Sequence, residues 1–223
     1  MYLGLTDVDA AGPIPDIPKP DESEIDFLLD TVNTALALPV SRADIRGVFS
    51  GLRPLIDSAG GVGESLADVS RRHDVRVTDG SMVSVIGGKL TTYRQMAQDA
   101  VDAAVASAGL IANDCITTSV ALVGATPVDP VFPAGLPASL IARFGAEAPK
   151  VVEDATVGEP LAPIVEGIDV TRAEIEFAFT HEGALDVDDV LDRRTRIGLV
   201  PADADRARPA VEQIAARVLE QLV

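Results

Sequence analysis

Residues 83–94 read V-S-V-I-G-G-K-L-T-T-Y-R, and the interpretation of the whole chain starts from this stretch. A short apolar run that ends at Ile86 is typical of a strand, and apolar residues then recur at helical spacing from Leu90 onward. The paired glycines Gly87 and Gly88 separate the two patterns. The stretch therefore predicts a strand, a glycine turn and a helix.

A turn of this kind can bind an anion or an electron-rich ring. Glycines let backbone N–H groups approach a ligand closely, and the first turn of a helix presents unpaired N–H groups and a partial positive charge. The same residues are also compatible with an ordinary helix start, in which a threonine hydroxyl caps the first turn. Lys89, Thr91 and Thr92 therefore keep two interpretations on this stretch alone.

Basic residues are concentrated around the glycine turn. The chain has 18 Lys and Arg against 35 Asp and Glu, a formal charge of −17. Residues 46–94 hold seven basic and five acidic residues, so this segment is +2 and the remainder is −19. A basic island in an acidic protein suits a small dianion such as a phosphate ester, although such charges also pair with one another on surfaces.

Two further motifs precede the turn. G-L-R-P-L at residues 51–55 places Arg53 inside an apolar run, where it either extends its charged end to the surface or pairs with a ligand anion. S-R-R-H follows at residues 70–73, and alternation along a strand would place Arg71 and His73 on the same face. Both motifs therefore add candidate anion-binding arginines.

In this order the three motifs resemble those of FAD-dependent glycerol-3-phosphate dehydrogenase. That family carries G-x-R-P-L, S/T-R-x-H/Y and S-V-x-G-G-K-L-T-T-Y-R, and the counterparts here begin at Gly51, Ser70 and Ser84. Y-L-G-L-T-D at residues 2–7 is similar to a family Y-I-G-T-T-D strand, and R-R-T-R at residues 193–196 to a family R-R-T-R/K. The family's G-x-G-x-x-G fingerprint has no counterpart in the 223 residues. We therefore expect the C-terminal part of such an enzyme.

The resemblance implies a reaction and a set of site residues. The family oxidises sn-glycerol 3-phosphate at C2 to dihydroxyacetone phosphate, with hydride passing to flavin N5 and electrons to quinone. By motif position, the cofactor FAD would be bound by Gly87, Gly88, Lys89, Leu90, Thr91 and Thr92, with the N–H groups of residues 88–91 facing the pyrimidine edge of the ring. Arg53 and Arg71 would bind the substrate phosphate, and Arg53 and Lys89 would be the catalytic residues. The general base is not assigned, and His73 is not chosen for it because the family also has tyrosine there.

Two alternatives to this function stay open. The polypeptide could be a non-catalytic truncated or split-gene product that acts only as a partner subunit of a separate flavin-binding chain, or as a remnant. It could also pass electrons to oxygen, as glycerophosphate oxidase does. Because much of the affinity for FAD should come from the missing dinucleotide-binding half, we expect a polypeptide of residues 1–223 alone to be colourless and inactive.

The pattern of the whole chain predicts an α+β fold with two domains. Residues 1–112 would form the C-terminal portion of the FAD- and substrate-binding domain, a mixed sheet with helices whose first strand is residues 2–7. Residues 109–137 are rich in proline and glycine and contain the boundary. Residues 113–223 would form a small all-helical domain.

Several helix signals are local and specific. Residues 21–36 begin with acidic residues and continue with apolar residues at helical spacing. Thr171 and Glu174 form a capping box, and residues 188–198 predict a helix with a basic last turn. Pro209 either marks the first turn of a final helix or lies within it as a kink.

Composition argues against several partners. The charge of −17 opposes binding of nucleic acid or anionic lipid over a broad surface, and the arginines of residues 193–196 are expected to pair with nearby aspartates. No apolar run reaches membrane-spanning length and no leader pattern stands at the start, so we expect a cytoplasmic protein, with peripheral membrane contact allowed for the complete enzyme. Cys115 has no partner cysteine and is expected to be a buried apolar residue. His181-Glu182 lacks a second histidine at metal spacing, so no metal site is expected.

Overall fold

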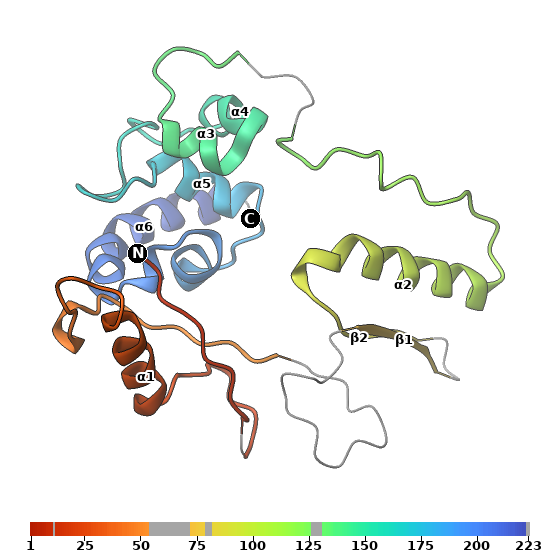
Figure 1. Ribbon diagram of the computed structural model, residues 1–223. Coiled ribbons are helices and arrows are strands. Elements are labelled where there is room, and N and C mark those ends of the chain that lie inside the picture. The colour runs from red at the N-terminus through yellow and green to blue at the C-terminus, as the bar shows by residue number, and fades with distance from the viewer. Residues whose placement is uncertain (11, 54–71, 79–81, 126–130, 222–223) are drawn as a thin grey trace. The chain divides into compact units, whose positions relative to one another are not determined.

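The computed structural model describes residues 1–10, 12–53, 72–78, 82–125 and 131–221 (Figure 1). The chain forms two compact units. Unit 1 consists of Met1–Arg42 and Phe49–Val120, and unit 2 consists of Ala43–Val48 and Ala121–Val223. The compact units divide after Val120. The predicted domain boundary after residue 112 stays a prediction.

The later part of unit 1 is a β-hairpin followed by a helix (Figure 1). Its elements are β1 (His73–Val77), β2 (Val83–Gly87), the 3-10 turn η3 (Leu90–Thr92) and α2 (Tyr93–Ala108). Helix α2 packs against both strands and ends at Gly109, whose φ of 61° is a left-handed conformation that favours glycine. The strand, glycine turn and helix predicted around residues 83–94 are confirmed.

The predicted mixed sheet is wrong for the described residues. The sheet there has two strands, β1 and β2, and they are antiparallel. A connection as short as the one between Val77 and Val83 can join only antiparallel neighbours, because a parallel pair needs a long crossover. Residues 2–7, predicted as a strand, do not pair with any strand in the described part of the chain, so that prediction is also wrong.

The N-terminal part of unit 1 contains α1 (Glu22–Asn33), as the pattern at residues 21–36 predicts. Its start is a reciprocal cap: the Glu24 carboxylate accepts the Asp21 N–H at 2.8 Å. The first turn carries Glu22 and Glu24, which the helix dipole favours at this end.

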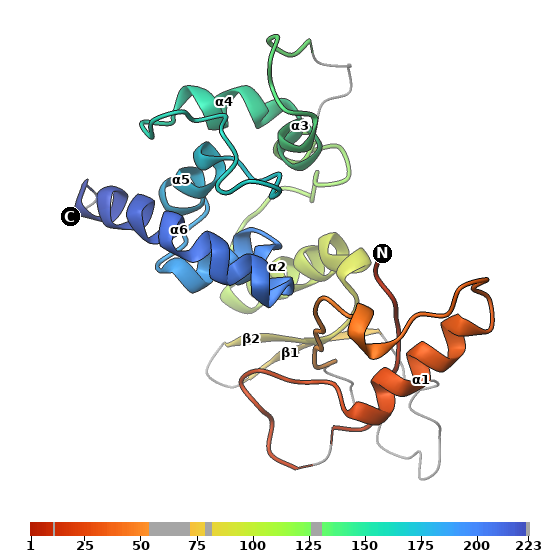
Figure 2. The same cartoon turned by 90° about the vertical axis from the view of Figure 1, so that its left-hand side faces the viewer.

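Unit 2 is helical in its described residues. Its elements are α3 (Ala138–Phe144), the 3-10 turn η4 (Gly145–Glu147), α4 (Ala148–Glu153), α5 (Arg172–Thr180), the π-helical turn η5 (Asp189–Arg194), the 3-10 turn η6 (Ile197–Leu199) and α6 (Pro201–Gln221). Helices α5 and α6 lie side by side, in both views (Figures 1 and 2). Pro209 lies inside α6 and does not mark its first turn, as the first of its two interpretations would have it. None of the helices in the described part is long and apolar enough to cross a membrane.

The helix predicted over residues 188–198 is shorter than expected. The π-helical turn ends at Arg194, because Thr195 has an extended backbone with φ −116° and ψ −177°. The Thr195 hydroxyl then donates to the carbonyl oxygens of Val190 at 2.8 Å and Leu191 at 3.2 Å. This side chain satisfies carbonyls that a continued helix would have bonded.

Among the residues that the structure describes, the buried side chains lie in unit 2. Among the described residues, the buried hydrophobic side chains all lie between Leu140 and Val218. One cluster is built around Ile175, Leu191 and Val211, each at most 1% exposed, and a second is built around Leu140, Val151 and Phe177. The described residues of unit 1 include no comparably buried apolar side chain.

Candidate functional site

An open pocket in unit 1 brings two of the three sequence motifs together. Its volume is about 520 Å³. The described residues that line it are Gly51, Leu52, Arg53, Gly88, Lys89, Leu90 and Thr91. The first three belong to the G-L-R-P-L motif, and the other four belong to the glycine turn and the first helical turn. Five of the predicted site residues, Arg53 and residues 88–91, therefore share one pocket.

The backbone conformation of the turn requires glycine at positions 87 and 88. Gly87 has φ 74° and Gly88 has φ 84°, both in the region that L side chains rarely adopt. A Cβ at Gly88 would lie 2.5 Å from Met96 Sδ and 3.2 Å from His73 Cβ. A substitution such as Gly88→Val would therefore strain the turn and its packing on α2 and β1, whether or not a ligand is present. Loss of a ligand in that variant would not by itself show a ligand contact.

The first helical turn has features of both a capped helix start and a ligand-binding turn. The Thr92 hydroxyl accepts the Lys89 N–H at 3.3 Å and donates to the Lys89 carbonyl at 3.0 Å, so Thr92 stabilises the turn. The N–H groups of Leu90 and Thr91 have no hydrogen-bond partner within the part of the chain that the structure describes. These two donors are therefore available to a ligand, whereas the Lys89 N–H is already engaged.

The pocket carries two cationic side chains. Arg53 is 40% exposed, and its Nη1 donates to the Asp7 carboxylate. Lys89 is exposed, and no ion pair to it is recorded in the described ranges. Arg76, another member of the basic island, is paired with Asp74 on the surface at 2.6 Å. The third motif arginine, Arg71, lies outside the described residues, so its predicted role stays a prediction.

His73 is tied to α2 rather than to the pocket. Its Nε2 lies 2.6 Å from Asp99 Oδ2, and its side chain is 18% exposed. The hydrogen bond with His73, followed by one from Gln95, lowers the pKa of the Asp99 carboxyl. This contact fixes β1 on α2 and is compatible with leaving His73 out of the catalytic set.

Cys115 corrects one expectation. It is exposed rather than buried, because residues 110–120 contribute to neither buried cluster. Its Sγ lies 3.0 Å from Thr117 Oγ1, and this hydrogen bond lowers the pKa of the thiol. A single exposed cysteine with a threonine neighbour defines no site.

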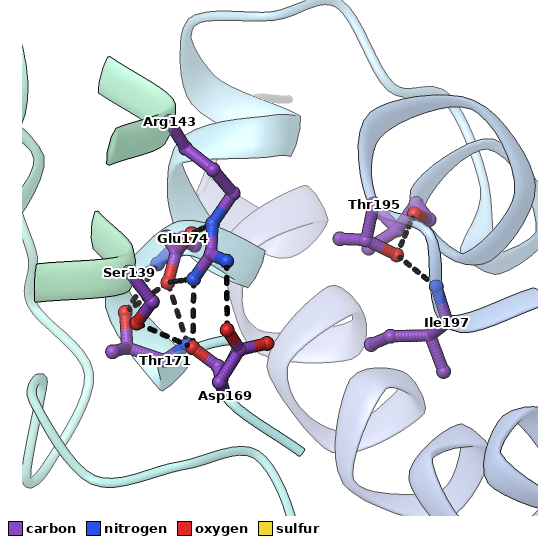
Figure 3. A network of polar contacts seen from close by, with 8 residues as sticks. Ser139, Arg143, Asp169, Thr171, Glu174, Thr195 and Ile197 are labelled. Carbon is purple, nitrogen blue, oxygen red and sulfur yellow. Dashed lines mark hydrogen bonds and ion pairs between the residues drawn. The ribbon is translucent and has the colours of Figure 1, made fainter. Parts of the chain in front are cut away.

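The main polar cluster of unit 2 is structural (Figure 3). The predicted capping box is confirmed: Thr171 Oγ1 accepts the Glu174 N–H at 3.3 Å, and the Glu174 carboxylate accepts the Thr171 N–H at 2.7 Å. Arg143 of α3 donates through Nε to Glu174 at 2.5 Å and through Nη2 to the Asp169 carbonyl at 2.7 Å. Ser139 also donates to that carbonyl, at 3.1 Å. The side chains in this cluster satisfy one another, so it joins α3 to α5 and is no candidate for ligand binding.

Other charged groups in the described part of unit 2 also have structural roles. Arg193 pairs with Asp189 at 2.7 Å, as predicted, and Arg194 donates to the Glu182 carbonyl at 2.7 Å. No group of three or more His, Cys, Asp or Glu in the described ranges is arranged to hold a metal ion.

Comparison with known proteins identifies the family. Residues 115–222 match the family model of the C-terminal domain of alpha-glycerophosphate oxidase. The chain is 54% identical over 221 residues to glycerol-3-phosphate dehydrogenase 1 of Mycobacterium tuberculosis, an alignment that covers 97% of this chain and 43% of that protein. The chain belongs to the glycerol-3-phosphate dehydrogenase family.

Two more distant glycerol-3-phosphate dehydrogenases agree. The protein from Mycobacterium leprae is 38% identical over 197 residues, covering 82% of this chain and 33% of the relative. A mitochondrial protein of Arabidopsis thaliana is 31% identical over 248 residues, covering 99% and 37%. The chain thus spans less than half the length of these relatives. The resemblance carried by the sequence motifs is confirmed, and the roles of the individual pocket residues stay predictions.

Proposed function

We propose that the chain supplies the C-terminal, substrate-side part of an FAD-dependent oxidoreductase. The enzyme would oxidise sn-glycerol 3-phosphate to dihydroxyacetone phosphate and pass the electrons to quinone. The names of the dehydrogenase relatives support the substrate. One observation about the chain itself carries the proposal: Arg53 and the glycine turn, remote in the sequence, line a single pocket.

Arg53 is assigned to the substrate phosphate, and Lys89 lies nearby in the same pocket. A guanidinium can donate two parallel hydrogen bonds to phosphate oxygens, and an ammonium adds a point charge from another direction. Arg53 comes from the G-L-R-P-L motif and Lys89 from the glycine turn, so the two cations reach the pocket from separate segments. Arg71 is assigned to the same phosphate by its motif position.

The residues of the glycine turn fit a flavin edge. The unpaired N–H groups of Leu90 and Thr91 can donate to the oxygen and nitrogen atoms of the pyrimidine edge, and the N-terminal end of η3 and α2 favours negative charge there. Gly87 and Gly88 supply the left-handed turn, and Thr92 holds it by bonding the Lys89 backbone. When bound, FAD supplies the hydride acceptor. The chain's own groups orient the substrate and place positive potential beside the reacting atoms.

The decisive experiment is Arg53→Ala in an assembly that also contains the dinucleotide-binding part of the enzyme. A charge-assisted hydrogen bond to phosphate is worth about 1.5 to 3 kcal/mol, so the KM for glycerol 3-phosphate should rise about 10- to 150-fold. The flavin absorbance of the purified assembly should not change. Arg76→Ala is the matched control, because Arg76 is an exposed arginine of the same unit that pairs with Asp74 and does not line the pocket. Loss of flavin with an unchanged KM would contradict the assignment.

Oxygen is the second candidate for the electron acceptor, because the family model that matches residues 115–222 is that of an alpha-glycerophosphate oxidase. Hydrogen peroxide formation in air would favour the oxidase, and reduction of a quinone without peroxide would favour the dehydrogenase. An assembly that holds flavin but reduces neither acceptor would support the non-catalytic alternative. We also propose a cytoplasmic location, which fractionation of cells can test.

A further inference from the structure

We propose that Asp7 is a positioning residue for Arg53 and thereby sets the affinity of the pocket for a phosphate ester. The inference rests on the proposed function of Arg53. Arg53 Nη1 donates to Asp7 Oδ2, and the Asp7 side chain is 38% exposed. Asp7 is absent from the described residues that line the pocket, whereas Arg53 is among them. Asp7 therefore contacts the guanidinium from outside the pocket.

The contact engages only one nitrogen of the guanidinium. Nε and Nη2 of Arg53 have no hydrogen-bond partner within the described part of the chain. These two nitrogens form one edge of the planar fork, the edge that can donate two parallel bonds to an oxyanion. A carboxylate that holds Nη1 fixes the rotation of the fork and leaves that edge available. The position of Asp7 thus decides where the available edge of Arg53 points.

Asp7 is itself held in place by its neighbour in sequence. Thr6 Oγ1 donates to the Glu24 carboxylate at 2.5 Å, and Glu24 also accepts the Asp21 N–H at 2.8 Å at the start of α1. The hydrogen bond from Thr6 is the main cause that lowers the pKa of Glu24, followed by the bond from Asp21. Glu24 therefore stays ionised at neutral pH and keeps accepting from Thr6. A continuous set of contacts runs from the first turn of α1 through residues 6 and 7 to Arg53.

Positioning and competition predict opposite results for the loss of Asp7. A carboxylate that occupied the binding edge of Arg53 would compete with phosphate, and its removal would tighten binding. A carboxylate that holds the opposite end of the guanidinium would weaken the attraction between Arg53 and phosphate through its negative charge. It would also fix the orientation of the long Arg53 side chain before the ligand arrives, so that binding costs less conformational entropy. The single contact at Nη1, made by a residue outside the pocket lining, favours positioning.

The test uses the assembled enzyme with Asp7→Asn. We expect the KM for glycerol 3-phosphate and the inhibition constant of inorganic phosphate to rise together, by about three- to tenfold, because an amide binds a guanidinium more weakly than a carboxylate does. Flavin content and melting temperature should stay the same. Thr6→Val should change both constants in the same direction by a smaller factor, and Asp7→Glu should restore part of the affinity because it keeps the charge. Asp16→Asn is the control, since Asp16 is exposed and makes no recorded contact in the described ranges.

The outcomes separate this inference from the proposed function. If Arg53→Ala leaves both constants unchanged, the proposed function of Arg53 is wrong. If Arg53→Ala raises them but Asp7→Asn does not, the proposed function stands and the positioning role of Asp7 is wrong. Tighter phosphate binding by Asp7→Asn would show that Asp7 competes with the ligand and would also overturn the inference. Should Asp7→Asn fail to fold, unchanged constants in a folded Thr6→Val enzyme would overturn it instead.

Discussion

Replacing Glu174 by alanine should destabilise unit 2 more than any single surface change. Glu174 is 4% exposed and accepts hydrogen bonds from four groups. These are the Thr171 N–H at 2.7 Å, the Thr171 hydroxyl at 2.9 Å, Arg143 Nε at 2.5 Å and Arg143 Nη2 at 3.1 Å (Figure 3). Removing the carboxylate leaves the donors of two other residues without their main acceptor. The contacts between α3 and the start of α5 should therefore weaken together.

The size of the loss follows from the burial of each partner. Thr171 is 3% exposed, so its orphaned N–H should cost about 1 to 3 kcal/mol of unfolding free energy. Arg143 is 33% exposed and keeps the Asp169 carbonyl at 2.7 Å, so the penalty for a fully buried pair does not apply and about 1 kcal/mol is appropriate. The sum is about 2 to 4 kcal/mol. Arg143→Ala should cost less than Glu174→Ala, and the double variant should cost less than the sum of the two.

Urea denaturation followed by far-ultraviolet circular dichroism is the suitable assay, because the chain has no tryptophan to report by fluorescence. Amide hydrogen exchange within α5 would assign the loss to unit 2 rather than to unit 1. Glu212→Ala is the matched control, since Glu212 is an exposed glutamate on α6 and alanine favours helix. A loss for Glu174→Ala no larger than that of Glu212→Ala would refute the argument.

Two further substitutions test the electrostatics and the packing of unit 2. Burial raises the pKa of Glu182, so its ionised form disfavours the folded state and stability falls as pH rises from its unfolded pKa toward its folded pKa. Glu182→Gln should therefore raise the melting temperature at neutral pH, and a gain that persisted unchanged at about pH 4 would contradict this cause. A Cβ at Gly47 would overlap the Leu199 carbonyl oxygen, so Gly47→Ala should lower the unfolding free energy by about 1 to 3 kcal/mol. Gly158→Ala, where a Cβ would meet nothing within 4 Å, should leave the chemical denaturation curve unchanged, and equal curves for both variants would show that the segment adapts freely.

Elements with a local signal in the sequence were predictable. The acidic start of the helix at residues 21–36 and the capping box at Thr171 each depend on residues within about one helical turn, and the structure has both. The glycine turn was predictable for the same reason, because Gly87 and Gly88 interrupt two opposite periodicities. The prediction of a helix over residues 188–198 was wrong about its end. The helix stops where the Thr195 hydroxyl donates to the Val190 carbonyl, and the spacing of apolar residues does not report such a hydrogen bond.

Contacts between distant residues were not predictable from local pattern. The Asp7 carboxylate reaches Arg53 across 46 positions, and His73 reaches Asp99 across 26. Asp7 stands in a stretch whose pattern predicts a strand and gives no sign of a contact with an arginine of the pocket. Gly47 likewise lies against the Leu199 carbonyl, although the two residues of unit 2 are far apart in the sequence. Motif resemblance could name the pocket residues, but the groups that hold them in position required the fold.

The distribution of burial has a consequence for how ligands should act on this protein. The buried apolar clusters of the described residues lie in unit 2, whereas in unit 1 Leu90 is 87% exposed and Tyr93 is 50% exposed. A two-stranded hairpin with one packed helix is marginal by itself, so the lowest free energies of local opening should belong to the elements that carry the glycine turn. A ligand that binds there stabilises the elements it contacts by mass action. The stability of a cooperative unit that the ligand does not contact stays almost unchanged. Substrate or flavin should therefore slow amide exchange in β2 and η3 and not in the buried part of α5, so the pocket, rather than the helical core, is where ligand binding and folding are coupled.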